Sequence, residues 1–402
     1  MGSGISRSSR SLLVSLVASV AAGSIGLACV GDDPASSSSP PGTDASSPVD
    51  AGSSTDTGVD PSSDAGDSDA DAAPACPPSV DLMTDDKNCG TCGHDCLGGA
   101  CAAGACQPKF VEDSMPTFTA AEPGSTGYVY WSDYLAGANG KIRRMPKDFS
   151  AAPVTIATGD RPTGIALTPN LVYWTEYAGG VGSKVHFSNK DGSNANTTGS
   201  SFKGPWWIAA DATDVYFVNR DDTIEIVTGA IGSTTTSNVF LSGGQVMGAV
   251  SITVDASHLF VGTVANGLFR FDKNGLNKVT LAPSVVGYAV DGNQLYLTHD
   301  KGLFRIGTDG TCPTPATDCQ IATGADATGS VAVDASHVYW ITTDPTNGTA
   351  VHRADKTGQN PITLYVRAAD TAPGNLVLDD EAIYWAVQSA GSNVGRLYKL
   401  AK

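Results

Sequence analysis

The chain has 402 residues, of which only 16% are charged, and its 24 basic residues are outnumbered by 41 acidic ones, which gives a formal net charge of −17. Nucleic acids and anionic lipid surfaces attract clustered lysine and arginine, so this charge argues against both as electrostatic partners. The 46 glycines and the low charged fraction favour an all-β, turn-rich chain over a helical one.

The N-terminal segment has the layout of a bacterial export signal. Two arginines precede an apolar stretch at 12–22 that is too short to span a membrane. The sequence IGLAC at 25–29 resembles a lipobox, in which a small residue precedes a cysteine that is diacylated and becomes the mature N-terminus. The resemblance implies a signal peptide at 1–28 and lipidation of Cys29, with ordinary cleavage beside an unmodified cysteine as the alternative. Val30, which is not aspartate, permits delivery to the outer membrane.

Residues 29–75 are predicted to form a disordered tether. After the cysteine this segment consists mainly of Ser, Asp, Pro, Gly and Ala and contains no aromatic residue, so it cannot bury enough apolar surface to fold. Ten aspartates lie between Asp32 and Asp71 with no lysine or arginine among them. Their mutual repulsion is expected to keep the segment extended from the membrane.

Eight further cysteines point to disulfides, because export places them in an oxidising compartment. Cys312 and Cys319 form an isolated pair that is expected to restrain an outer loop. The other six lie within residues 76–106 at Cys76, Cys89, Cys92, Cys96, Cys101 and Cys106. A segment this small has almost no apolar core, so three disulfides are expected to hold it folded. The sequence does not choose among the possible pairings.

The rhythm CGTCGHDC at 89–96 resembles the stigma-specific-type cysteine module, which recurs in bacterial surface lipoproteins with Asp/Ser-rich spacers. The alternative is a zinc site, in which Cys89 and Cys92 act with His94 and Cys96 as ligands. Export and the absence of a second Cys-x2-Cys pair favour disulfides.

From residue 110 onward a β-branched or aliphatic residue followed by two mostly aromatic ones recurs seven times. The middle residues are spaced 43, 43, 44, 36, 43 and 45 positions apart, at Tyr130, Tyr173, Tyr216, Phe260, Tyr296, Tyr339 and Tyr384. This period suits a four-stranded β-propeller blade. Three adjacent large apolar residues need cover on both faces of their strand, which stacked blades provide. An open solenoid is the alternative, and it would need capping ends.

The sequence therefore predicts an all-β fold over residues 107–402, a seven-bladed β-propeller of four-stranded antiparallel blades. The last repeat reaches the end of the sequence without a fourth strand, and residues 109–112 precede the first repeat as an unassigned strand-like segment. We expect this segment to pair with the last repeat and close the ring, which would also protect exposed strand edges.

Two motifs add a family resemblance to this repeat. YWSD at 130–133 and YWTE at 173–176, with DGS at 191–193, resemble the YWTD-type (LDL-receptor class B) propeller across roughly residues 115–402. That family has six blades, so a six-bladed ring is the alternative to the seven repeats counted here. The resemblance implies an architecture and does not transfer ligands.

Aspartates and histidines recur at equivalent positions of the repeats. The strand before the anchor usually ends in aspartate, at Asp211, Asp255, Asp291, Asp334 and Asp379. An axial calcium-binding ring is one interpretation, and we favour the other, Asx-type turns whose carboxylates accept local backbone N–H groups. His258 matches His337 and His186 matches His352, which indicates structural roles. We expect neither a metal site nor a cofactor.

A ligand site is expected on the loops that enter the inner strands, because they surround the mouth of the central channel. The sequence is least repetitive there, at 160–162, 202–207 and 245–247. The candidate ligand-binding residues are Arg161, Lys203 and Trp206. For Trp206 the alternative is a space-filling role between blades.

Two classes of function remain open. The first is a monomeric, lipid-anchored propeller that binds an envelope protein or glycan, with no catalytic residues and the lipid as its only membrane contact. The second is a propeller enzyme, such as a lactonase, a lyase or a glycan-cleaving enzyme. An enzyme would need non-repeating acids or histidines converging at the channel mouth, where Glu176, Asp300 and Arg161 are the residues to examine.

Overall fold

The computed structural model describes residues 76–402, apart from gaps at 179–180, 199–201, 220–224, 236, 242–248, 264–266, 284, 286, 300–301, 313–318, 324–328, 345–347, 369 and 390–393. The predicted signal peptide, Cys29 and the tether lie outside the described residues. The described part contains no α-helix, and none of its segments is a helix of the length and apolarity that a membrane crossing requires.

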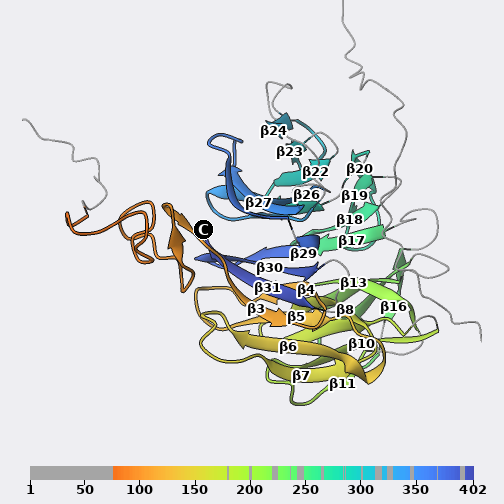
Figure 1. Cartoon of the computed structure of the whole chain (residues 1–402). Helices are drawn as coiled ribbons and strands as arrows, with labels where there is room; N and C mark the ends of the chain where they lie inside the picture. The colour runs from red at the N-terminus through yellow and green to blue at the C-terminus, as the bar shows by residue number, and fades with distance from the viewer. Residues whose placement is uncertain are drawn as a thin grey trace, which may run out of the picture. The chain divides into compact units, whose positions relative to one another are not determined.

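Seven four-stranded antiparallel sheets follow one another along the chain (Figure 1). Blade 1 contains β4 (Pro116–Ala121), β5 (Tyr128–Asp133), β6 (Gly140–Pro146) and β7 (Val154–Gly159). Blade 2 contains β8 (Pro162–Leu167), β9 (Leu171–Glu176), β10 (Val181–Asn189) and β11 (Asn196–Thr197), with β12 (Phe202–Lys203) also paired to β10. Blade 3 contains β13 (Pro205–Ala210), β14 (Asp214–Asn219), β15 (Glu225–Ala230) and β16 (Ser237–Leu241).

The remaining four blades repeat this order. Blade 4 contains β17 (Ala249–Val254), β18 (His258–Thr263), β19 (Gly267–Asp272) and β20 (Val279–Ala282), and blade 5 contains β21 (Gly287–Asp291), β22 (Gln294–His299), β23 (Gly302–Gly307) and β24 (Gln320–Thr323). Blade 6 contains β25 (Val331–Val333), β26 (His337–Asp344), β27 (Gly348–Asp355) and β28 (Ile362–Arg367). Blade 7 contains β29 (Asp370–Leu378), β30 (Ala382–Ser389), β31 (Gly395–Ala401) and, from the other end of the chain, β3 (Lys109–Asp113).

The first strands of successive blades contact one another around a closed ring. The contacts run from β4 to β8, β13, β17, β21, β25 and β29, and β29 then contacts β4. This confirms the predicted seven-bladed β-propeller, and the six-bladed and open-solenoid alternatives are wrong.

The second strand of each blade carries the repeated anchor, and both of its faces are buried. In blade 1 Val129, Tyr130 and Trp131 are each fully buried. Val129 and Trp131 pack against Tyr384 of blade 7, whereas Tyr130 packs with Ile165 of blade 2. Alternate side chains of one strand therefore fill the two neighbouring interfaces, which is why three adjacent positions are apolar.

The ring closes through β3, which confirms the expectation that residues 109–112 pair with the last repeat. β3 pairs antiparallel with β31 from Lys109 opposite Lys399 to Asp113 opposite Gly395 (Figure 1). Polar contacts also join the closing strand to blade 1. Asp113 accepts hydrogen bonds from Arg143 Nη1 at 2.6 Å and from Trp131 Nε1 at 2.9 Å, both in blade 1.

The inner strands of blades 7 and 1 are joined by one asparagine. The Asn375 amide donates to the backbone oxygen of Thr119 and accepts from its backbone nitrogen, with both distances 2.7 Å. This pair of hydrogen bonds reproduces a strand-to-strand contact across the junction where the chain's two ends meet.

Four of the five repeated aspartates form Asx turns at the ends of the inner strands that lie away from the channel mouth. Asp334 Oδ1 accepts the backbone N–H groups of Ser336 and His337 at 2.9 and 2.8 Å, and Asp211, Asp255 and Asp379 accept the equivalent groups of their own turns. These local bonds confirm the turn interpretation.

A second set of contacts uses the same acids to join neighbouring blades. Asp334 Oδ2 of blade 6 accepts from Tyr339 Oη at 3.0 Å and from Lys402 Nζ, at the end of blade 7, at 2.8 Å. We call this arrangement of an acid with its own blade's tyrosine and the next blade's lysine a Tyr–acid–Lys latch. Its other tyrosine-bearing examples are Tyr216–Asp211–Lys273, Tyr130–Glu122–Lys190 and Tyr384–Asp379–Lys147, and Lys356 pairs with Asp291 across the junction of blades 5 and 6.

The cysteine-rich segment docks on blade 7. Its paired strands β1 (Cys101–Ala102) and β2 (Ala105–Cys106) immediately precede β3. Four of its six cysteines share one apolar cluster with Leu400 and Ala401 of β31. His94 Nε2 lies 3.1 Å from the backbone oxygen of Lys402. The segment therefore contacts blade 7, whose fourth strand, β3, directly follows it in the chain.

Removal of the closing strand should destabilise the whole ring. We compare residues 107–402 with residues 114–402, which differ only by β3 and its two preceding linker residues. Losing five strand residues at about 1 kcal/mol per hydrogen bond should lower the melting temperature on the order of 10 °C. Circular dichroism during heating provides the measurement. Equal melting temperatures would contradict a structural role for β3, and the cysteine module, absent from both chains, cannot account for a difference.

The latch at Asp334 should contribute pH-dependent stability. Burial alone raises the pKa of this carboxyl, but Lys402 and the turn N–H groups outweigh it and lower the pKa to about 2. Asp334→Asn should reduce the unfolding free energy by about 2 kcal/mol at pH 7. Because the folded pKa is depressed, the wild-type contribution is complete above about pH 4 and is lost as the pH falls towards about 2.

Asp255→Asn is the matched control for the latch. Asp255 makes the same Asx turn, but the position equivalent to the latch lysine in the next blade is Thr308. Urea denaturation at several pH values should therefore show a smaller loss for the control. If both variants lose equally, the turn bonds rather than the latch carry the effect.

Candidate functional site

An aromatic cluster lies at the channel mouth where blades 1, 2 and 3 meet. Trp206 begins blade 3 on β13, and its ring centroid lies 5.5 Å from those of both Tyr134 and Tyr177. Tyr134 directly follows β5 and Tyr177 directly follows β9. All three side chains are half-buried, so they join neighbouring blades while keeping part of each ring at the surface. We refer to these three residues with Arg161 as the mouth cluster.

Arg161 is held in an unusual backbone conformation beside these rings. Its φ is +49°, in the left-handed region that favours glycine. Its N–H donates to the Leu135 oxygen at 2.8 Å, and its own oxygen accepts the Tyr177 N–H at 3.1 Å. Two neighbouring loops therefore fix a conformation that costs energy for a residue with a side chain, and such positions are frequent at binding sites.

The charged groups around Arg161 are already ordered. Its guanidinium lies 3.3 Å from Asp160, and 32% of its side chain is exposed. Asp160 Oδ1 also accepts the Gly137 N–H at 2.6 Å, which ties the loop after β5 to the loop before β8. The site therefore presents a cation, a carboxylate and aromatic faces on pre-organised backbone.

Glu176 and His186 form a close pair behind this surface. Glu176 Oε2 lies 2.5 Å from His186 Nε2, and Oε1 accepts the Asp160 N–H at 2.9 Å. Burial raises the pKa of Glu176, but these two hydrogen bonds outweigh it and leave the pKa below its usual value. The carboxylate is thus held ionised by the same loop that carries Arg161.

The histidines retain the repeat-related roles expected from sequence. His186 stacks on Trp174 and His352 stacks on Trp340, each with ring centroids 5.3 Å apart. His352 contacts Thr342 and Thr363, and burial lowers its pKa to about 4. His258 and His337 belong to the turns of Asp255 and Asp334. Of the two stacked histidines, only His186 in blade 2 also contacts an acid, Glu176.

The three sequence candidates are not all brought together. Arg161 and Trp206 both contact Tyr177, the first through its backbone oxygen and the second through its ring. Lys203 lies on β12, where it pairs with Val181 of β10, three residues before Trp206. Trp206 and its neighbour Trp207 both pack against the apolar cluster between blades 1 and 2, which agrees with the space-filling role considered for Trp206. The Trp207 ring lies 4.7 Å from that of Phe118. Residues 245–247 and Asp300 lie outside the described residues.

Sequence reasoning missed Tyr134 and Tyr177. Both directly follow the four-residue motifs YWSD and YWTE, so they occupy equivalent positions in blades 1 and 2. That shared position was the available signal. The motif alone identifies both tyrosines as members of the repeat, and it does not show that a neighbouring blade places Trp206 against their rings.

Two buried carboxyl groups lie at the seam on the mouth side. Asp133 ends β5 and is fully buried, and its oxygens accept no hydrogen bond from the described residues. Burial, followed by the nearby Asp113 carboxylate, raises the pKa of Asp133 to about 7, with Arg143 acting in the opposite direction. These acids face the packed seam, where Asp113 binds Arg143 and Trp131.

A pocket of about 450 Å³ lies among the inner strands of blades 1, 2, 6 and 7. Its lining includes Ile165, Leu167, Val333 and Val377, with Thr119 and Asn375 as polar members. Most of the lining side chains are aliphatic, whereas the mouth cluster combines aromatic rings with an arginine.

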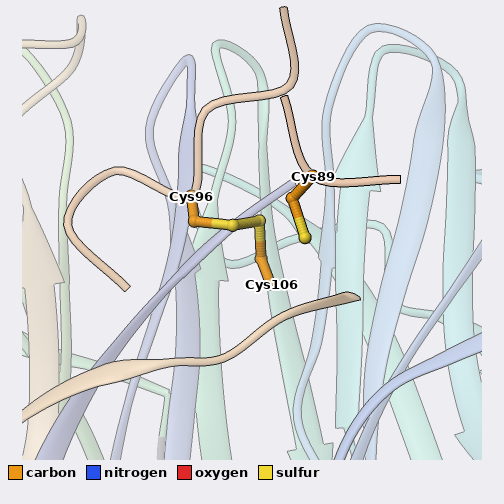
Figure 2. Close-up of side chains that lie close together, drawn as sticks. All are labelled: Cys89, Cys96 and Cys106. Carbon is orange, nitrogen blue, oxygen red and sulfur yellow. A yellow bond between two sulfur atoms is a disulfide. The ribbon is translucent and has the colours of Figure 1, made fainter. Parts of the chain in front are cut away.

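All eight described cysteines form disulfides, as predicted. The pairs are Cys76–Cys92, Cys89–Cys101, Cys96–Cys106 and Cys312–Cys319. The zinc ligands considered from sequence are separated by this pairing, because Cys92 bonds to Cys76 and His94 contacts the backbone oxygens of Cys89 and Lys402. A different group of sulfurs comes together: those of Cys89, Cys96 and Cys106 lie within 4.8 Å of one another (Figure 2).

Comparisons with known proteins bear on the fold. No protein-family model matches the chain, and no curated protein matches it. The WD40 β-propeller domain of Doa1 is 10% identical, with a TM-score of 0.54 over 72% of this chain and 95% of that chain. This similarity shows a β-propeller and nothing finer.

Two further solved structures are similar at lower scores. The computationally designed Ika8 protein is 11% identical over 72% of this chain and 96% of that chain, with a TM-score of 0.46. A chain of a nidogen/laminin complex is 18% identical over 48% of this chain and 75% of that chain, with a TM-score of 0.40. The YWTD-type and stigma-specific-type resemblances stay resemblances.

The raised pKa of Asp133 should make the propeller more stable at pH 5 than at pH 8. Because the folded pKa lies above the unfolded value of about 3.9, stability falls as the pH rises from about 4 to about 7. Asp133→Asn should remove most of this slope, as measured by urea denaturation across that range. The exposed Asp380→Asn is the control and should keep the wild-type slope. An unchanged slope in Asp133→Asn would contradict the assignment.

Proposed function

We propose that this propeller is a recognition module that binds an envelope protein or glycan at the mouth cluster. The observation that carries the proposal is the strained Arg161 backbone, fixed between Tyr177 and Leu135 next to half-exposed aromatic rings. Trp, Tyr and Arg dominate the energy of protein interfaces. Aromatic faces combined with a few fixed polar groups also suit the apolar faces and hydroxyls of a sugar ring.

The proposal includes display on the bacterial envelope. Lipidation of Cys29 would anchor the chain, and Val30 at the next position permits delivery to the outer membrane. The aspartate-rich tether at 29–75 would hold the propeller away from the lipid. The lipid is then the chain's only membrane contact, and a single copy carries a complete mouth cluster, so we propose a monomer without nucleic acid or cofactor.

The enzyme alternative is favoured by one observation, the 2.5 Å contact between Glu176 and His186 near Arg161. We prefer binding because His352 stacks on its tryptophan in the same way in blade 6, where Thr342 replaces the acid. A side chain that recurs in this way supports blade packing in both places. The acid instead orders the Asp160 loop through a backbone N–H.

Arg161→Gly tests recognition separately from folding. Glycine adopts a positive φ without strain, so the variant should keep its stability or gain up to about 1 kcal/mol. Loss of the guanidinium should weaken ligand retention at least about tenfold. The assay immobilises residues 76–402, exposes them to envelope extract at several salt concentrations, and digests parallel samples with protease or glycosidase to separate the two ligand classes.

Trp206→Ala should also lose retention, whereas Leu276→Ala should bind as the wild type. Leu276 is 63% exposed in the turn after β19 and serves as a matched surface control. Retention that survives in Arg161→Gly and Trp206→Ala would place the ligand elsewhere. No retained protein or glycan under any salt condition would count against the binding proposal itself.

A further inference from the structure

The aromatic part of the mouth cluster offers a ligand flat apolar surface. The ring of Trp206 is inclined at 53° to that of Tyr134 and at 71° to that of Tyr177, with both centroids 5.5 Å away. All three side chains are half-buried, so each keeps part of its ring at the surface. Aromatic faces stack on C–H groups, and one face of a pyranose ring presents a set of these. The row of three rings is long enough for a short oligosaccharide.

The polar part of the site places an acceptor and a donor side by side. Arg161 Nη1 lies 3.3 and 3.4 Å from the two carboxylate oxygens of Asp160, at the long end of the range for a hydrogen bond. The two side chains are 32% and 28% exposed. A sugar hydroxyl both donates and accepts. Neighbouring hydroxyls of one ring can therefore donate to Asp160 and accept from Arg161.

Both polar side chains are ordered before a ligand arrives. Asp160 Oδ1 accepts the Gly137 N–H at 2.6 Å, and the Asp160 N–H donates to Glu176 Oε1 at 2.9 Å. The backbone of Arg161 is fixed by its bonds to Leu135 and Tyr177. Fixed groups lose little conformational entropy on binding, which favours a small ligand that makes few contacts.

We infer that the ligand of the mouth cluster is a neutral glycan, which rests on the proposed function and narrows it to one chemical class. The positive charge of Arg161 is already matched by Asp160, and Glu176 adds a second carboxylate behind it. A sugar that carries uronate or phosphate groups would meet these carboxylates and a chain of net charge −17. A neutral sugar meets no such repulsion.

The extent of the site favours a glycan over a protein. Stable protein interfaces take about 20–30 residues from each partner. The mouth cluster with Asp160 gathers its aromatic and polar groups within a few side chains, which matches the footprint of a short oligosaccharide. Trp206 would stack on the apolar face of a ring while Asp160 and Arg161 bind hydroxyls at its edge.

The test measures the binding of oligosaccharides to the whole chain carrying Cys29→Ser, which removes the predicted lipid attachment. The neutral probes are maltotriose, cellotriose, chitotriose and mannotriose, and trigalacturonic acid is the acidic probe. Saturation-transfer NMR and titration of the tryptophan fluorescence report binding. We expect a neutral probe to bind with a dissociation constant of about 1 mM that does not change with salt, and the acidic probe not to bind. Absence of binding by every neutral probe would overturn the inference.

Asp160→Asn separates a neutral ligand from an anionic one. The amide oxygen can still accept the Gly137 N–H, but the negative charge beside Arg161 is lost. A neutral sugar should then bind about tenfold more weakly, because hydrogen bonds to a charged acceptor are the stronger ones. An anion would instead bind more tightly. Asp380→Asn, in an exposed turn of blade 7, makes the same change in net charge and should bind as the wild type. Tighter binding by Asp160→Asn, or equal binding by all three chains, would contradict a neutral glycan held by this pair.

Failure of this inference can be told apart from failure of the proposed function. If no neutral sugar binds, but Arg161→Gly loses a protease-sensitive ligand from envelope extract, the mouth cluster recognises a protein and only the ligand class is overturned. If a neutral sugar binds the wild type, Arg161→Gly and Trp206→Ala equally well, the ligand lies elsewhere and both proposals are overturned. Circular dichroism during heating confirms that each variant is folded.

Discussion

The antiparallel pairing of β3 with β31 is the constraint on which the rest of the ring depends. Every interface between blades buries one face of an anchor strand, so a gap at any position would expose a row of large apolar side chains. Blade 7 lacks a fourth strand of its own until Lys109–Asp113 arrives from the other end of the ring. Asp113 then binds Arg143 and Trp131 and carries the closure into blade 1.

The two ends of the inner strands divide structural and recognition roles between them. At one end, turn acids bind their own backbone, their own tyrosine and a lysine from the next blade. Because these contacts repeat, the same residue types recur along the chain. At the other end, the mouth cluster has no such requirement, and its Arg161 and Trp206 occur once. Function is therefore expected where the repeat is interrupted.

The number of blades was predictable because it depends on local pattern. Three adjacent apolar residues such as Val129–Trp131 require cover on both faces, and seven such anchors give seven blades. The closing strand was predictable by counting strands in the last repeat. The latch lysines were not, because Lys402 and Asp334 meet only after two blades have folded and packed. The same reason applies to the sulfurs of Cys89, Cys96 and Cys106, which the fold of the module brings within 4.8 Å of one another.

The mouth cluster was half predictable. Arg161 and Trp206 break the repeat, whereas Tyr134 and Tyr177 belong to the repeated pattern and differ from it in no visible way. The contact between blades, which no single repeat encodes, decides that these two rings flank Trp206. A repeat residue can thus serve a site when a neighbouring blade supplies a non-repeating partner.

The cysteine module solves a problem created by closing the ring from a distant part of the chain. Loop-closure entropy grows only with the logarithm of chain length, so a remote strand costs little more to recruit than a nearby one. A strand at the edge of a blade nevertheless frays more readily than a strand that is paired on both sides. The module directly before β3 docks on Lys402 and Leu400. The strand is therefore held both by its pairing with β31 and by the module that precedes it. Cross-links in the module consequently act on the seam, which lies away from the residues proposed to recognise a ligand.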